Sequence, residues 1–235
     1  MAGAAFLMVH DGRFPTGGHA HSGGLEAAIG SGAVTTAADL ERWLRGRLQT
    51  TGRVDAAFAA MAWAVAGPDG DGPDGDGLRW SRLAGEYWAR NPSPALRAAS
   101  RAQARGWLRA LAASWPSPAA TELAAATSPA GPPWAVAFGA GARGCGLSLA
   151  DTALSVATAS VQGPAWAATR LTGMDPYAVT ACLARLAPEI DAVAGEATAW
   201  GDAEGDAAAL PASSAPLLDI GAEVHRGWEV RLFAS

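Results

Sequence analysis

The chain of 235 residues contains no lysine, so each of its 17 basic residues is an arginine. A P-loop nucleotide-binding protein needs its lysine to reach the β- and γ-phosphates of the nucleotide. A Schiff-base enzyme likewise needs a lysine amine. The absence of lysine therefore excludes both classes, although it does not exclude a protein that regulates a P-loop partner.

Cysteines and long apolar runs are also scarce. The two cysteines, Cys145 and Cys182, form no CxxC pair, which predicts free thiols in a reducing compartment. No apolar run reaches the roughly 20 residues of a membrane span, and no basic region precedes the first apolar stretch, as it would in a signal peptide. The net charge of −5 disfavours an unspecific nucleic-acid binder, which needs a basic surface. We therefore expect a cytoplasmic protein that binds neither membrane nor nucleic acid.

The composition favours helices. Half of the residues are hydrophobic, and much of that half is alanine, the residue with the highest helix propensity. Few stretches combine β-branched residues with the alternation that half-buried strands show. We therefore predict an all-α fold, a single-domain bundle of roughly eight to ten helices over residues 1–235.

Local signals divide the first part of the chain. Thr36 followed by Asp39 predicts a capping box at the start of a helix. Apolar residues then recur at helical spacing on both sides of Gly52, which predicts an antiparallel helical hairpin that turns at this glycine. The repeat of turn residues at 67–77 predicts a flexible surface loop, and residues 116–133 are expected to contain a connection.

The densest candidate site is the glycine-rich segment FPTGGHAHSGGLE, residues 14–26, here called the signature. Its glycines allow positive φ angles or the close approach of another backbone. His19 and His21 have a spacing that metal-dependent hydrolases use. However, only His10 and His225 remain as further histidines, and no HExxH motif occurs. A turn with exposed imidazoles is the simpler interpretation, and no catalytic residue is predicted.

The C-terminal segment, residues 226–235, is here called the tail. Leu232 and Phe233 are large apolar residues at a chain end, where fraying normally removes the benefit of packing. Arg231 beside them is a bidentate donor suited to a carboxylate. Either the tail docks onto its own domain or it becomes ordered against a partner.

Four segments of the chain together resemble the UreF family of urease accessory proteins. They are FPTGGHAHSGGLEAA, which contains the signature, the mid-chain NPSPALRAASRAQARGWLRAL, the long run from GLSLADTALSV to ARLAPEIDAVA, and the ending PLLDIGAEVHRGWEVRLFAS. They cover most of the chain in the family's order. No single segment is a catalytic motif, but their order makes the resemblance specific.

The resemblance implies an all-helical, dimeric protein that is not itself an enzyme. Such a protein binds a UreD/UreH-type partner, recruits the nickel-carrying GTPase UreG, affects its GTPase step and helps to deliver nickel to apo-urease. No stably bound cofactor is expected, because the assembled complex handles the nickel. The signature and the tail are expected to become ordered, and to meet, when the UreD/UreH-type partner binds.

Carried over residue by residue, the resemblance implies partner-binding residues in the signature and in the tail: His21, Ser22, Gly24, Leu25, Glu26, Arg231, Leu232, Phe233 and Ser235. Trp166 and Arg170 are predicted in the dimer interface. His19 and His21 are the weak candidates for a transient nickel ligand. Two alternatives remain open, a metal-dependent hydrolase that uses His19 and His21, and a helical interaction module unrelated to urease.

Overall fold

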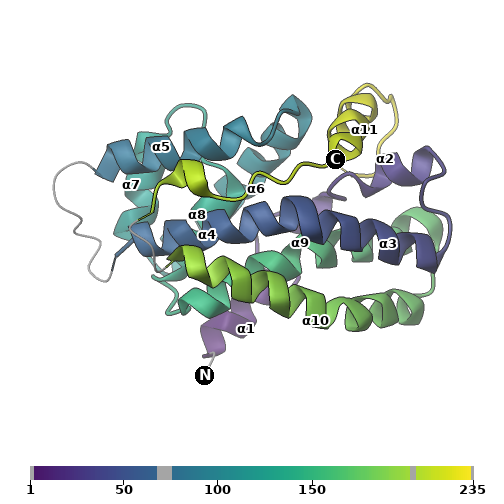
Figure 1. The fold of residues 1–235 in the computed structure, drawn as a ribbon, viewed down its shortest axis with the longest axis horizontal. Helices are drawn as coiled ribbons and strands as arrows, with labels where there is room; N and C mark the ends of the chain where they lie inside the picture. Colours follow the sequence, from purple (N-terminus) through teal and green to yellow (C-terminus); the bar gives the residue numbers. More distant parts are fainter. Residues whose placement is uncertain (1–2, 68–75, 202–204, 234–235) are drawn as a thin grey trace.

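The computed structural model describes residues 3–67, 76–201 and 205–233, and no strand occurs in these ranges (Figure 1). Its α-helices are α1 (Ala4–His10), α2 (Leu25–Gly30), α3 (Ala37–Arg47), α4 (Arg53–Val65), α5 (Asp76–Ala89), α6 (Pro94–Ser114), α7 (Pro118–Ala126), α8 (Trp134–Ala142), α9 (Leu149–Thr172), α10 (Pro176–Gly201) and α11 (Pro216–Arg226). Two 3-10 turns are η1 (Gly18–Ala20) and η3 (Ala207–Ala209). The predicted all-α fold is confirmed.

Helices α3 and α4 are two halves of one continuous rod. A π-helical segment, η2 (Leu48–Gly52), joins them, and Gly52 itself keeps right-handed helical angles of φ −61° and ψ −42°. The prediction of a hairpin at this glycine is therefore wrong. Gly52 instead permits the close approach of α9, because a Cβ there would lie 2.6 Å from the hydroxyl oxygen of Ser160. Since the rod is unbroken, the eleven α-helices of the described residues form ten helical bodies, within the predicted range.

The rod connects two hydrophobic clusters. The first lies mainly among α4, α5, α6, α7 and α8 and includes Phe58, Trp80 and Trp107. The second lies mainly among α2, α3, α9 and α10 and includes Leu44. Helix α4 gives Phe58 to the first cluster and Ala56 to the second, and α9 and α10 run beside the rod (Figure 1). The two clusters are therefore joined through one rigid element.

Small residues let α4 and α8 approach each other closely. Every residue of α8 after Trp134 is buried, and most of these are alanine or glycine. A Cβ added at Gly139 would lie 2.2 Å from the carbonyl oxygen of Ala59 on α4. The backbones of the two helices are thus in direct contact, so the alanine-rich composition serves close packing as well as helix propensity.

Residues 116–133, expected to contain a connection, contain the nine-residue helix α7. The hydroxyl of Ser117 caps its first turn by accepting a hydrogen bond from the Ala120 amide. Pro118 stands at its start, where proline needs no hydrogen-bond partner, and Leu123 is fully buried. The predicted connection is present, because residues 127–133 join α7 to α8, and Ser117 and Pro118 begin a helix within the same segment.

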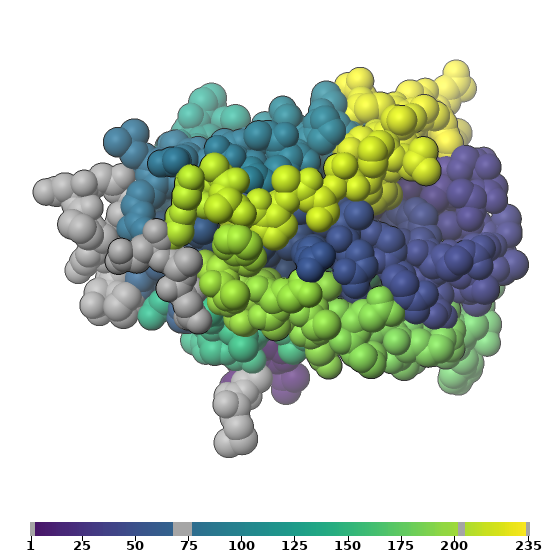
Figure 2. Space-filling model, in the orientation of Figure 1, coloured from purple at the N-terminus to yellow at the C-terminus, as the bar shows by residue number. Residues whose placement is uncertain are grey.

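The C-terminal helix α11 lies beside α2, whereas the N-terminal helix α1 lies on the opposite side of the molecule (Figure 1). Helix α11 packs against α2 and α6, and Figure 2 shows the yellow C-terminal segment beside the violet segment that contains α2. The predicted loop at 67–77 falls mostly on residues 68–75, which lie outside the described residues. Among the described helices, none has the length and apolar character that a membrane span requires.

Candidate functional site

The signature forms a loop that ends in helix α2. Gly17, Gly23 and Gly24 have φ angles of 74°, 60° and 92°, in the left-handed region that favours glycine. A Cβ at Gly24 would also lie 2.9 Å from the Leu218 side chain on α11. The glycines therefore shape the loop and admit the C-terminal helix beside it.

Glu26, in the first turn of α2, binds the backbone of the tail. The Leu232 amide donates to its Oε1 atom over 2.9 Å, and the Phe233 amide donates to its Oε2 atom over 3.0 Å. Both Glu26 and Phe233 are buried, and the Phe233 ring belongs to the second hydrophobic cluster. Hydrogen bonds to an ionised carboxylate are stronger than neutral ones. The signature and the tail are thus joined within a single chain.

His225 on α11 lies beside the Glu26 carboxylate. Its side chain is 1% exposed, and its Nε2 atom is 3.0 Å from the Oε2 atom of Glu26. Neither ring nitrogen makes an aligned hydrogen bond with a described residue. The Trp228 ring packs edge-on against the imidazole at 4.9 Å between centroids. Glu26 is therefore enclosed by an imidazole and two backbone amides.

Arg170 on α9 touches both the signature and the tail. Its Nη1 atom donates to the carbonyl oxygen of His19 over 3.2 Å. Its guanidinium carbon lies 4.7 Å from the centroid of the Phe233 ring, a cation–π contact. Trp166, one turn earlier, is 41% exposed. The structure thus places Arg170 against its own chain, and the dimer role of Arg170 and Trp166 stays a prediction.

Arg47 on α3 binds the backbone of the signature and of α9. It donates from Nη1 to the carbonyl oxygen of Gly23 and from Nε to that of Ser160 on α9, each over 2.8 Å. Burial lowers the pKa of Arg47, although an arginine remains charged in proteins. One guanidinium therefore connects α3, α9 and the signature.

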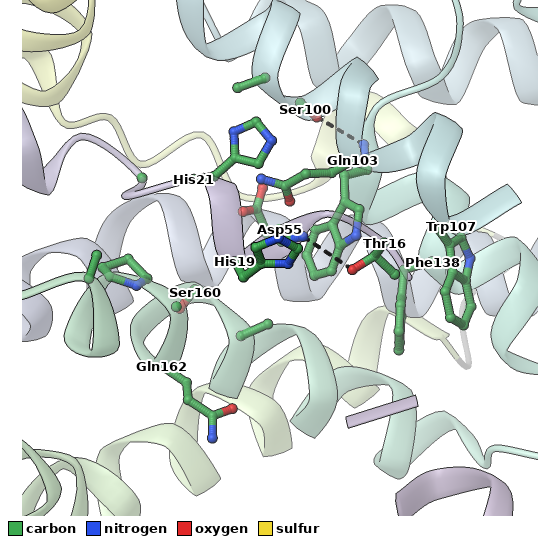
Figure 3. A pocket seen from close by; sticks show the side chains of 18 of the residues that line it. Thr16, His19, His21, Asp55, Ser100, Gln103, Trp107, Phe138, Ser160 and Gln162 are labelled. Atoms are coloured by element: carbon green, nitrogen blue, oxygen red, sulfur yellow. Dashed lines mark hydrogen bonds between the residues drawn. The ribbon is translucent and has the colours of Figure 1, made fainter. Parts of the chain in front are cut away.

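A cavity of about 540 Å³ lies between the signature and the helical bundle (Figure 3). His19 and His21 of the signature line it, together with Asp55, Gln103 and Trp107 from α4 and α6. Its wall thus combines aromatic rings with amide, imidazole and carboxyl groups, a lining typical of small-molecule and partner-binding cavities.

Asp55 is a buried carboxyl group on the wall of the cavity, and its pKa is shifted. The hydroxyl of Tyr87 donates to its Oδ1 atom over 2.7 Å, and no described cation forms an ion pair with it. Burial raises the pKa of Asp55 to about 6, while the Tyr87 hydrogen bond and the charge of Arg47 oppose that rise. Burial and the nearby Asp55 also raise the pKa of Tyr87 well above its ordinary value.

We expect Asp55→Asn to change how stability depends on pH. From about pH 3.8 to about 6, folded Asp55 holds a proton that the unfolded chain has lost. The Asp55 contribution to the free energy of unfolding therefore falls as pH rises through this window, by at most about 1.4 kcal/mol per pH unit. Urea denaturation of wild type and Asp55→Asn from pH 4 to 8 isolates this contribution as their difference. A difference that does not change with pH would contradict the assignment.

The described residues hold no group of three histidine, cysteine or acidic side chains arranged to bind a metal ion. Within this part of the chain, His19 and His21 therefore do not belong to a ligand set of the kind that a metal-dependent hydrolase needs. The thiols Cys145 and Cys182 are buried and unpaired. Burial raises the pKa of Cys145 to about 11, which suppresses its thiolate form.

The residues predicted to bind a partner fall into three groups. In the first group, the Glu26 carboxylate accepts hydrogen bonds from the amides of Leu232 and Phe233, as described above. Ser22 and Leu25 are fully buried, and the Ser22 hydroxyl accepts a hydrogen bond from the Glu26 amide over 3.3 Å. The remaining ones are Gly24, against α11; His21, on the cavity wall; Arg231, exposed; and Ser235, outside the described residues.

Neither His225 nor Arg47 was predicted to belong to the site. A signal for His225 exists in the spacing of the closing helix. Leu218, Ala222 and His225 follow one another at intervals of four and three residues, so the histidine falls on the apolar face. The structure buries all three. A polar ring on such a face is a position to test for function.

Fold and site together define an all-helical protein in which an N-terminal signature and a C-terminal tail form one assembled surface. The UreF family profile matches residues 34–187. The chain is 41% identical to the urease accessory protein UreF of Mycolicibacterium vanbaalenii, over 99% of this chain and 98% of that protein. It is 40% identical to UreF of Mycobacterium sp. (strain JLS) over 97% of each, and 38% identical to UreF of Mycobacterium tuberculosis over 94% and 93%. The chain belongs to the UreF family of urease accessory proteins.

Proposed function

We propose that this protein is a non-enzymatic scaffold in urease maturation. It joins a UreD/UreH-type accessory protein to a UreG-type GTPase and regulates GTP-dependent insertion of nickel into apo-urease. In this proposal the protein acts in the cytoplasm as a homodimer, and nickel is a cargo of the assembled complex. Membership of the UreF family supports the general role, and the resemblance of the signature and the tail supports the particular partners.

The joined signature and tail carry this proposal. The tail, which Glu26 of the signature binds through its backbone, presents a surface on which Val230 and Leu232 are 81% and 64% exposed. Arg231 is exposed between them. Arginine is enriched at protein interfaces, and the exposed apolar side chains beside it provide apolar area that a partner can bury. The surface therefore suits a protein partner better than a small substrate.

The test is a pull-down of the tagged chain, co-expressed with the urease accessory and structural proteins of its host. We expect wild type to capture the UreD- and UreG-like proteins. Arg231→Ala should weaken capture by about tenfold or more, as for a central interface arginine, and truncation before Arg231 should abolish it. Arg79→Ala changes an exposed arginine of α5; it is the matched control and should bind like wild type.

Two outcomes would contradict the proposal. Wild type that captures neither partner would remove the scaffold role. Urease that is fully loaded with nickel and active in a strain without this chain would remove the role in maturation. Circular dichroism of each variant shows whether a loss of capture reflects unfolding instead.

A further inference from the structure

We propose that the outer face of helix α6 docks an acidic helical segment of a protein partner. This face, here called the arginine face, consists of Arg101, Arg105 and Arg109. It does not include the signature or the tail. The proposal concerns the chemistry of this surface and does not rest on the proposed function.

The arginines of α6 recur every four residues, from Arg97 to Arg109, and the 21 residues of the helix include no acidic side chain. Residues four apart are neighbours on one side of a helix. Arg105 and Arg109 are exposed, and Arg101 is half-buried. The other residues of this side are small, namely Ala98, Ala102 and Ala112. The outer side of α6 therefore carries positive charge that its own helix does not balance.

The inner end of the row is held by the fold. Arg97 donates from Nε to the carbonyl oxygen of Asn91 and from Nη2 to that of Trp88. The Arg101 guanidinium carbon lies 4.5 Å from the centroid of the Trp88 ring, a cation–π contact. The Nε atom of Arg101 is buried and has no hydrogen-bond partner among the described residues. A side chain that is already held in place loses less conformational freedom when it binds a partner.

The three arginines of the face form no ion pair with a described acidic residue. Between α3 and α10, by contrast, Arg45 pairs with Glu189 over 2.8 Å and Arg185 pairs with Glu41 over 2.7 Å. The whole chain has a net charge of −5, so a row of unbalanced cations is a local exception. Complementary charge steers and orients protein partners. We therefore expect another protein to supply the carboxylates.

The spacing of the face suits carboxylates that lie on a helix. Residues four apart are separated by about 6 Å along the helix axis. Arg105 and Arg109 can thus each bind one of two carboxylates that are a helical turn apart in the partner, and the guanidinium group has the fork geometry for such a pair. The alanines beside them leave room for a second helix to approach. The fitting segment therefore has glutamate or aspartate at every fourth position.

Other anionic partners suit this face less well. Single-stranded nucleic acid is bound by aromatic side chains on which bases stack, whereas Trp107 of α6 is buried and the Trp88 ring is covered by Arg101. A helix that lies on a membrane surface needs large apolar side chains to insert, whereas the outer side of α6 offers alanine. A protein segment is the partner that the face favours.

A synthetic stapled helix with glutamate at every fourth position and alanine between tests the face. We expect the full wild-type chain to bind it at low ionic strength, measured by fluorescence anisotropy, and to release it as salt screens the charges. Arg105→Glu combined with Arg109→Glu should weaken binding by about tenfold or more. Arg79→Glu combined with Arg82→Glu is the matched control. It reverses the same number of charges at two exposed arginines of α5 and should bind like wild type.

Equal affinity of wild type and the α6 variant for this peptide would overturn the proposal. Equal affinity of wild type for a peptide with the same residues in scrambled order would also overturn it, because the spacing would then have no role. Tighter binding of a single-stranded oligonucleotide of the same charge would assign the face to nucleic acid instead. Circular dichroism of each variant shows whether a loss of binding reflects unfolding.

The absence of lysine makes it possible to test the same contact in an assembled complex. Arg105→Lys gives the chain its only side-chain amine, which a carbodiimide joins as an amide to a carboxylate in contact with it. With the urease accessory and structural proteins of the host present, mass spectrometry should find links from position 105 to an acidic helix of a captured protein. Arg79→Lys, the control, should give none.

The two proposals fail separately. If wild type captures its partners but the amine at position 105 links to none of them, the arginine face is not a docking surface and the scaffold proposal stands. If wild type binds the acidic peptide through α6 but captures no urease protein, the scaffold proposal fails and the arginine face stands.

Discussion

Trp107→Ala is expected to lower the free energy of unfolding by about 3–5 kcal/mol, the usual range for removing a buried aromatic side chain. Trp107 is fully buried in the first hydrophobic cluster. Its ring stacks on Phe138 at 4.7 Å between centroids and meets Phe14 of the signature at 5.8 Å. Its indole nitrogen donates to the Ala137 carbonyl oxygen over 2.9 Å. The substitution removes all these contacts and opens a void beside the cavity.

Urea denaturation measures this loss. Tyr177→Ala is the control, because Tyr177 is an aromatic residue that is 85% exposed and an exposed side chain contributes less. Its cost is expected to stay below about 1 kcal/mol. Equal losses for the two variants would show that burial of Trp107 does not determine the effect, and would contradict the prediction.

Gly139→Ala is expected to destabilise the protein by about 1–3 kcal/mol, the usual cost of overpacking a core. The new Cβ would meet the Ala59 carbonyl oxygen at 2.2 Å and the Ala62 Cβ at 2.8 Å. Because two of the nearest atoms belong to the α4 backbone, no side-chain rotation relieves the clash. The backbones of α4 and α8 must separate, and the neighbouring alanines lose contact with them.

Gly195→Ala in α10 is the control with the same chemical change. A Cβ at Gly195 would meet nothing within 4 Å, so only the helix propensity changes. Alanine there should stabilise the protein by roughly 0.5–1 kcal/mol. Thermal unfolding of both variants by calorimetry should therefore shift the midpoint in opposite directions. A stabilising shift for Gly139→Ala would mean that the helices are not in close contact.

Local signals in the sequence predicted the features that depend on local chemistry. The capping box is present, since the Thr36 hydroxyl accepts from the Asp39 amide and the Asp39 carboxylate accepts from the Thr36 amide. The structural role of Gly52 could not be predicted in the same way. Whether a glycine ends a helix or admits a neighbour depends here on Ser160, more than a hundred residues away. Sequence spacing alone does not show such a neighbour.

The candidate site also combines features that the sequence predicted with features that depend on distant residues. The resemblance identified the signature and the tail, and the apolar character of Phe233 raised the possibility that the tail docks onto its own domain, where the structure places it. The resemblance did not show that Glu26 binds the backbone of residues 232 and 233. Every residue except proline has a backbone amide, so a sequence does not distinguish the amides that a carboxylate binds. Nor did it indicate His225, whose role depends on the fold bringing α11 against α2.

The π-helical turn between α3 and α4 fixes the rotational phase of the rod. Each residue of an α-helix turns the next side chain by about 100° around the axis, and a π turn accommodates an additional residue without breaking the helix. Leu44 before the five-residue turn faces one cluster and Phe58 after it faces the other. Removing or adding one residue within 48–52 would rotate the two halves against each other and turn Phe58 away from its neighbours. In this turn the number of residues is a structural constraint of its own, independent of which side chains they carry.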